Sequence, residues 1–152
     1  MADAPKSRFV YVTYIRTTPE KLWEALTSAD AALKYWRGVR PEADWKKGGA
    51  WKLIFPDGRT ADSGEIEEYD PSRRLVIRWR NEWKPEFKAE GWSLCVFEIE
   101  SSDGGVKLTV DHSIDVANSG FIATVSGGWP QILSNLKSLL ETGEVVLPPM
   151  RF

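Results

Sequence analysis

The chain has 152 residues, of which 42% are hydrophobic and 28% charged, and its formal net charge at pH 7 is −2. This length suits one domain with an ordinary hydrophobic core. The net charge is slightly negative and no basic run is longer than two residues, which argues against a nucleic-acid-binding protein. A single cysteine, Cys95, excludes an internal disulfide, and no apolar stretch is long enough for a signal peptide core or a membrane span. We therefore expect a cytoplasmic protein.

The first third of the chain predicts one strand followed by two short helices. Residues 8–16 are mostly β-branched or aromatic, with alternate side chains on opposite faces. Thr18-Pro19-Glu20 combines an N-cap residue, a first-turn proline and an early acid, which together favour a helix start. Ser28 is placed to cap a second helix that ends near residue 36. Residues 37–48 are expected to form a loop.

Five further strand patterns follow, separated by turn residues. Short turns between successive strands indicate antiparallel hairpins. In the last of these strands, alternation places His112 on the same face as the apolar residues. The expected strands span residues 51–55, 61–69, 75–80, 92–100 and 106–114.

A charged loop over residues 81–90 carries Trp83 and Phe87. Exposed aromatic residues in a loop are typical of a lid or a contact patch. The alternative is a loop that packs its own aromatic side chains onto the domain.

Residues 120–142 favour one long helix that is bent at Pro130 and ends at Gly143. The alternative is a shorter helix that begins within residues 127–130, with Ser126 as a possible cap. An interior proline costs roughly 3 kcal/mol, so this helix needs support from tertiary packing. We expect a single domain over residues 1–152, with its core at about 8–143 and an irregular tail over 144–152. An antiparallel sheet with helices on one face belongs to the α+β class.

The order of elements resembles the START-like (helix-grip) superfamily and, within it, the family named for activators of a heat-shock-protein ATPase. The resemblance rests on Thr-Pro-Glu-Lys-Leu-Trp-Glu-Ala-Leu-Thr at 18–27 and on Gly-Trp-x-x-Ile-Leu-x-x-Leu-Lys-x-Leu-Leu-Glu-Thr-Gly at 128–143, with support from residues 64–75. It covers about residues 9–143. It implies a curved antiparallel sheet of about six strands wrapped around the C-terminal helix, with an apolar cavity between them. The superfamily binds lipids, sterols, polyketides or plant hormones, and the family has no shared catalytic motif.

Few residues offer reactive chemistry. His112, the only histidine, is expected near the cavity mouth, either as an acid/base group or as a structural residue bonded to its neighbours. Cys95 is expected to be buried and structural. One histidine and one cysteine do not fill a zinc shell, and the glycine pairs match no phosphate or dinucleotide motif, so we expect neither a metal nor a cofactor.

We therefore expect a small binding protein that takes a hydrophobic or aromatic molecule, lipid-like or polyketide-like, into the cavity. One alternative is a co-chaperone-like module, linked to stress response, that binds a protein partner through its surface near residues 81–90 and has a filled core. Another is a cyclase- or hydrolase-type enzyme that uses His112; binding is preferred to catalysis. The expected cavity wall comprises Phe9, Tyr11, Trp51, Leu53, Trp79, Phe97, Leu108 and His112 from the sheet, with Trp129, Leu133 and Leu136 from the helix.

Overall fold

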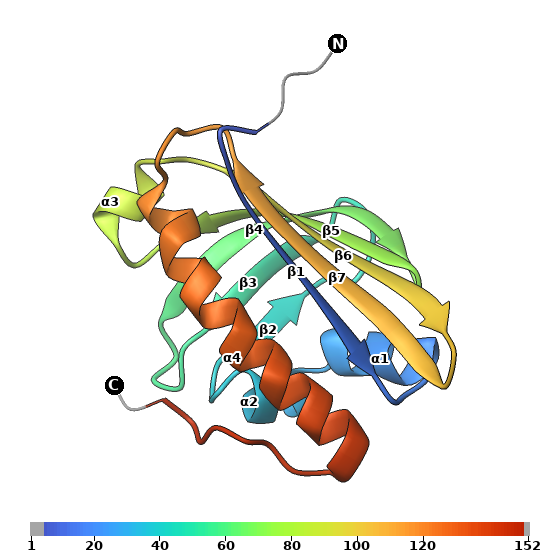
Figure 1. Ribbon diagram of the computed structural model, residues 1–152. Coiled ribbons are helices and arrows are strands. Elements are labelled where there is room, and N and C mark those ends of the chain that lie inside the picture. Colours follow the sequence, from blue (N-terminus) through green and yellow to red (C-terminus); the bar gives the residue numbers. More distant parts are fainter. Residues whose placement is uncertain (1–4, 151–152) are drawn as a thin grey trace.

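A computed structural model describes residues 5–150 of the chain. The strands are β1 (Ser7–Ile15), β2 (Arg40–Ala43), β3 (Ala50–Ile54), β4 (Thr60–Asp70), β5 (Arg74–Asn81), β6 (Ser93–Ser102) and β7 (Gly105–Ile114). The helices are α1 (Pro19–Leu26), α2 (Ala29–Tyr35), α3 (Pro85–Lys88) and α4 (Gly120–Thr142). The strands form one antiparallel sheet in the order β1-β7-β6-β5-β4-β3-β2, and α4 lies across one face of it (Figure 1). The α+β class and the helix-grip fold are confirmed.

The described part of the chain has seven strands where about six were expected, because β2 forms inside the segment expected as a loop. This segment, Arg40–Ala43, has no β-branched residue and contains Pro41, so its sequence does not indicate a strand. It pairs with β3 at the edge of the sheet, with Pro41 opposite Leu53. A proline is tolerated there because an edge strand leaves some of its N–H groups without a strand partner in any case.

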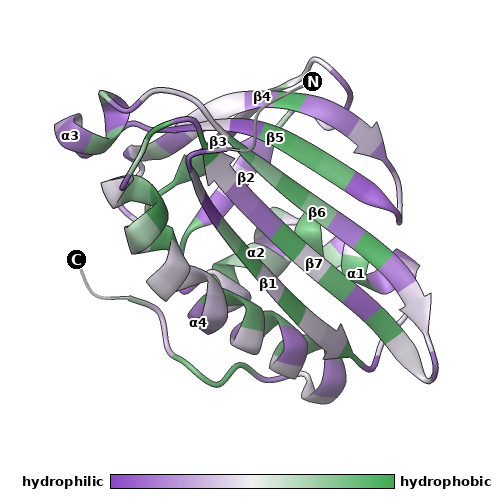
Figure 2. Ribbon diagram, turned by 45° about the horizontal axis from the view of Figure 1, so that its top comes forward, coloured by the Kyte–Doolittle hydropathy of each residue, from purple (hydrophilic) through white to green (hydrophobic). Residues whose placement is uncertain are grey.

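Side chains alternate between the two faces of the sheet, as the sequence pattern predicts. Hydrophobic and hydrophilic residues alternate along β6 and β7 in Figure 2. On β1, Val10, Val12 and Tyr14 are exposed, whereas Phe9 and Tyr11 face the helix side and pack against the core. The inner face therefore carries the core that α4 covers.

Helix α4 is one element with Pro130 inside it, so the long helix is favoured over a helix that begins near the proline. It begins at Ser119, whose side chain accepts a hydrogen bond from the Ile122 N–H at 3.0 Å, and it ends at the left-handed Gly143. Trp129, beside the proline, is 2% exposed. Burial of such a large side chain offsets the cost of the missing proline N–H.

The segment after α4 is held against the helix by one buried side chain, Asn135. Its Oδ1 accepts hydrogen bonds from the Val146 and Leu147 N–H groups at 2.9 and 2.7 Å, and its Nδ2 donates to the Leu147 and Tyr35 carbonyl oxygens at 3.0 and 3.4 Å. Within the tail expected over residues 144–152, residues 144–150 form neither helix nor strand, and residues 151 and 152 lie outside the described part.

Candidate functional site

A layer of tryptophans fills the space between the sheet and α4. The ring centroids of Trp51 and Trp79 lie 4.5 Å apart, and those of Trp79 and Trp129 lie 5.9 Å apart. Trp36, just after α2, approaches Trp129 at 5.4 Å. Contacts at these distances and tilts are favourable for aromatic pairs and leave little room between the rings. Most of the expected cavity is therefore occupied by the protein's own side chains.

A pocket of about 150 Å³ remains at one end of this layer, lined by residues of α3 and of the first half of α4. Figure 1 shows that α3 lies near the start of α4. An apolar cavity of about this size accommodates one benzene-sized ring. Its walls are mostly aromatic and aliphatic, with a few polar groups, which is the usual character of a small-molecule site. The lining residues are Trp36, Leu53, Asp62, Trp79, Asn81, Trp83, Lys84, Phe87, Phe121, Thr124, Val125, Gly128, Trp129 and Ile132.

Three of the eleven residues expected in the cavity wall, namely Leu53, Trp79 and Trp129, line this pocket. The other eight do not line it. Their side chains are on the expected inner side of the fold but are part of the packed core or lie against it: Phe9, Tyr11, Trp51, Phe97, Leu108, His112, Leu133 and Leu136.

The most important residue that the sequence analysis missed is Asp62 on β4. It stands opposite Leu53 of β3 and Asn81 of β5, and all three line the pocket. A signal was present, because counting back in steps of two from the buried Ile66 places Asp62 on the same face. The residue was missed because the first residues of this strand are polar and are therefore usually exposed.

Asp62 is 8% exposed, and its Oδ1 has no hydrogen-bond partner among the described residues. Burial raises the pKa of this carboxyl group to about 7, although the nearby Trp79 and Asn81 side chains pull the pKa down. The negative charge of Glu82 raises it slightly further. The Nε1–H of Trp79 also lacks a partner with hydrogen-bonding geometry in the described part of the chain. A buried acceptor and a buried donor thus stand unsatisfied in one pocket wall.

The segment after β5 covers the outer end of the pocket. Glu90 anchors this segment to α4, because its carboxylate accepts hydrogen bonds from the Ser119 hydroxyl and, at 3.2 Å, from the Phe121 N–H. Phe87 meets Phe121 edge-on at 6.1 Å, and Trp83 packs on Phe55 at 5.4 Å while staying 46% exposed. The loop therefore combines the two expectations: it packs its aromatic side chains onto the domain, and it also lies over the pocket.

His112 is fully buried in the core instead of lying at a cavity mouth. Its Nδ1 accepts a hydrogen bond from the Trp129 indole N–H at 3.2 Å. The ring proton is consequently on Nε2, which lies 2.9 Å from the Ser93 hydroxyl, and that hydroxyl donates to the Trp79 carbonyl oxygen at 2.7 Å. Burial lowers the His112 pKa to about 3. This geometry supports a structural, neutral histidine and gives no support to an acid/base role.

Cys95 stands opposite His112 in the sheet and is buried, as expected. Burial raises the pKa of its thiol well above the usual value, so the group stays protonated. No reactive Cys–His pair results, because both ring nitrogens of His112 are engaged by Ser93 and Trp129.

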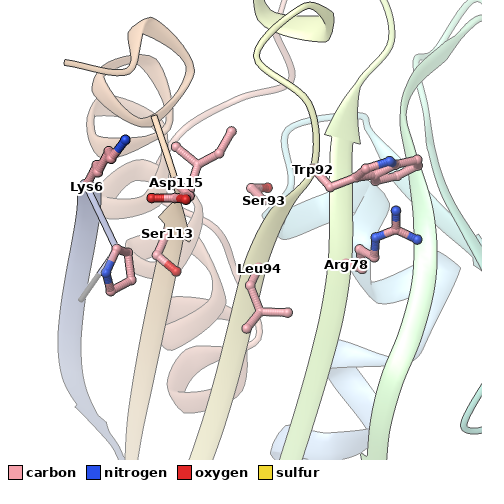
Figure 3. Close-up of a pocket in the computed structure, with 9 residues that line it drawn as sticks. Lys6, Arg78, Trp92, Ser93, Leu94, Ser113 and Asp115 are labelled. Atoms are coloured by element: carbon pink, nitrogen blue, oxygen red, sulfur yellow. The ribbon is translucent and has the colours of Figure 1, made fainter. Parts of the chain in front are cut away.

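A second, larger groove of about 730 Å³ lies on the outer face of the sheet, over β5, β6 and β7 (Figure 3), and is called the outer groove below. Trp92 and Leu94 are 39% and 41% exposed here. The guanidinium groups of Arg78 and Arg80 lie 4.2 and 4.5 Å from the Trp92 ring centroid. This outer groove therefore presents apolar surface beside positive charge.

Within residues 5–150, no three His, Cys, Asp or Glu side chains are grouped so that they could hold a metal ion. No helix in that part of the chain combines the length and the apolar character that a membrane crossing requires.

The chain is similar to several solved structures. The protein MLL2253 of Mesorhizobium loti superposes with a TM-score of 0.76 at 22% identity, over 88% of this chain and 96% of that one. PFC0360w, an HSP90 activator from Plasmodium falciparum, gives 0.72 at 26% identity, over 88% and 95% of the two chains. DynU16, a protein in the dynemicin biosynthetic locus, gives 0.72 at 20% identity, over 93% of this chain and 49% of that one.

No sequence among the curated proteins matches this chain. One family model matches residues 16–141, and its description is "Activator of Hsp90 ATPase homolog 1-like protein". Because this match spans most of the chain and agrees with the resemblance seen in the sequence, the chain belongs to the Activator of Hsp90 ATPase homolog 1-like protein family.

Proposed function

We propose that this protein binds a small aromatic, largely apolar molecule in the pocket lined by Asp62, Trp79 and Trp129. The observation that carries the proposal is a ring-sized space with aromatic walls in a core that is otherwise filled. Removing apolar ligand surface from water contributes roughly 25 cal/mol per Å². The similarity to DynU16, from a biosynthetic locus, is consistent with a small-molecule ligand. A cytoplasmic location is part of the proposal.

A glycine on α4 supports this use of the pocket. Gly128 lines it, and a Cβ atom built at Gly128 meets nothing within 4 Å. Glycine in a helix interior destabilises the helix by about 1 kcal/mol relative to alanine, so this position carries a cost in stability. A side chain at Gly128 would project into the open space that the ligand needs. Gly127 is equally unobstructed but exposed, and it does not line the pocket.

The two glycines provide a matched pair of variants. Gly128→Leu should fill the pocket and weaken toluene binding at least tenfold, whereas Gly127→Leu should bind toluene like the wild-type protein. Both changes replace a helical glycine, so their effects on helix stability are comparable. Ligand-observed NMR measures the affinities, and circular dichroism confirms folding. Equal affinities of the two variants, or no toluene binding by the wild-type protein, would contradict the proposal.

A second candidate function is binding of a protein partner through the outer groove. It is favoured by the exposed Trp92 and Leu94 beside two arginines, by the nearly filled core and by the similarity to an HSP90 activator. A chaperone of the Hsp90 class, with an acidic segment, is the partner we propose for this case, and a role in stress response would go with it. Calorimetry should then show binding that Trp92→Ala abolishes and Trp23→Phe, a change in the core, leaves intact.

A further inference from the structure

We propose that the pocket selects a phenol-class ligand, whose hydroxyl oxygen accepts a hydrogen bond from Trp79 Nε1 and whose hydroxyl proton is donated to Asp62 Oδ1. This inference rests on the proposed small-molecule function and specifies the ligand's chemistry.

Two buried side-chain atoms without a hydrogen-bond partner lie in the wall of this pocket. Among residues 5–150, Asp62 Oδ1 and Trp79 Nε1 are the only buried side-chain nitrogen or oxygen atoms without a hydrogen-bond partner. Both residues line the same pocket, and each is more than nine-tenths buried. Buried polar groups are nearly always paired, and leaving one unpaired is costly. Two such atoms in one wall indicate a partner that belongs in the pocket.

The placement of these two side chains follows from the sheet register. Trp79 on β5 stands opposite Gly64 on β4, and Asp62 is the next inward-facing residue along β4. Asp62 and Trp79 are thus diagonal neighbours on the inner face, and a hydrogen-bonding interaction of the indole N–H with the carboxyl group is the main effect that lowers the carboxyl pKa, although the two groups do not meet in full hydrogen-bond geometry. Gly64 is required there, because a Cβ atom at this position would lie 1.7 Å from the Arg78 carbonyl oxygen. One small ligand group can therefore reach both atoms.

A single hydroxyl group on the ligand would satisfy both Asp62 Oδ1 and Trp79 Nε1. A hydroxyl group is a donor and an acceptor at a single oxygen. A hydrocarbon satisfies neither Asp62 nor Trp79, and an anionic ligand would meet the carboxylate of Asp62 at close range. The aromatic remainder of the ligand fits the ring-sized space between Trp36, Phe121 and Trp129.

A cationic ligand is the main competitor, because aromatic walls and a carboxylate also suit an ammonium group. The protein already places a cation there. Lys84 lines the pocket, and its Nζ lies 5.1 and 5.2 Å from the ring centroids of Trp83 and Phe87. A second positive charge would be repelled by it, and a quaternary ammonium group has no acceptor for the Trp79 N–H. The observations therefore favour the neutral hydroxyl.

The test compares three probes of similar size at pH 8: p-cresol, toluene and benzyltrimethylammonium. Ligand-observed NMR gives their affinities for the full chain. We expect p-cresol to bind about tenfold more tightly than toluene, as for a hydrogen bond to a charged group. Asp62→Leu should reduce this advantage to about twofold while toluene binding persists. Trp79→Phe, which removes the N–H but keeps an aromatic ring, should also reduce the advantage.

The outcomes separate this inference from the proposed function. Binding of p-cresol and toluene with equal affinity overturns the hydroxyl selection but leaves the pocket's function standing. Tighter binding of benzyltrimethylammonium than of p-cresol overturns it in favour of a cation site. Failure of all three probes contradicts the proposed function itself. If Asp62→Leu does not fold, Asp62→Asn replaces it, because asparagine keeps the shape of the side chain and removes its charge. If p-cresol still binds that variant about tenfold more tightly than toluene, the inference is overturned.

Discussion

Replacing Asp62 by asparagine measures what it costs the fold to keep a carboxyl group in the pocket wall. Burial raises the pKa of Asp62 from 3.8 to about 7. Between these values the folded protein keeps a proton that the unfolded chain has released, so the stability of the folded state falls as pH rises from about 4 to about 7. A shift of about three pKa units corresponds to about 4 kcal/mol, which we take as an upper bound. Asparagine does not titrate.

Urea unfolding of both proteins at pH 4.5, 6 and 8 measures this difference. The stability advantage of Asp62→Asn over wild type should grow by roughly 2–4 kcal/mol across this range. His112, with its pKa lowered to about 3, has the opposite effect, because its contribution to stability is lost as pH falls from 6.5 towards 3. That effect is common to both proteins and cancels in the difference. Glu82, whose pKa is lowered chiefly by its hydrogen bond to Arg80, is likewise present in both proteins. A difference in stability between the two proteins that changes by less than about 0.5 kcal/mol across the pH range would mean that Asp62 is not held protonated by burial.

Three further changes probe the scaffold of the site. Asn135→Ala removes four hydrogen bonds between α4 and its surroundings. Urea unfolding should show that the free energy of unfolding falls by about 2–3 kcal/mol. A decrease below about 1 kcal/mol would mean that other contacts hold the tail. Gly64→Ala should lower the free energy of unfolding by about 3 kcal/mol or more, because the added Cβ atom clashes with the β5 backbone. Gly127→Ala adds a Cβ atom in open space and should not destabilise the protein. Similar melting temperatures of the two variants would contradict this. Glu90→Ala removes the acceptor for the Phe121 N–H. Amide hydrogen exchange over residues 82–91 should then accelerate, and toluene binding should weaken. Unchanged exchange would show that aromatic packing alone holds the loop.

The main features of the fold were predictable because they depend on local patterns. Alternation in β1, β6 and β7 defined the buried face, and Ser28 and Gly143 marked helix boundaries that the structure confirms. Strand β2 was missed because its strand character comes from pairing with β3 at a sheet edge and not from its own residues.

The site was predictable only in part. The sequence placed Trp79 and Trp129 on facing surfaces, and both line the pocket. It did not predict how much of the space between sheet and helix is filled, because that depends on the tilts and volumes of several tryptophans packed together. Asp62 was overlooked because a charged residue near a strand end usually faces water, although the alternation from Ile66 placed it on the inner face; its register opposite Leu53 shows that it lies inside.

A ¹⁵N NMR titration of the tryptophan indole N–H signals with p-cresol tests most directly whether the ligand enters the pocket. We predict shifts for Trp79 and Trp129, which line the pocket, and none for Trp23, which packs against Tyr69, or for Trp92 in the outer groove. Assignment by single Trp→Phe variants identifies each signal. Shifts of Trp92 with unchanged Trp79 and Trp129 signals would contradict the account, because binding would then occur on the outer face of the sheet.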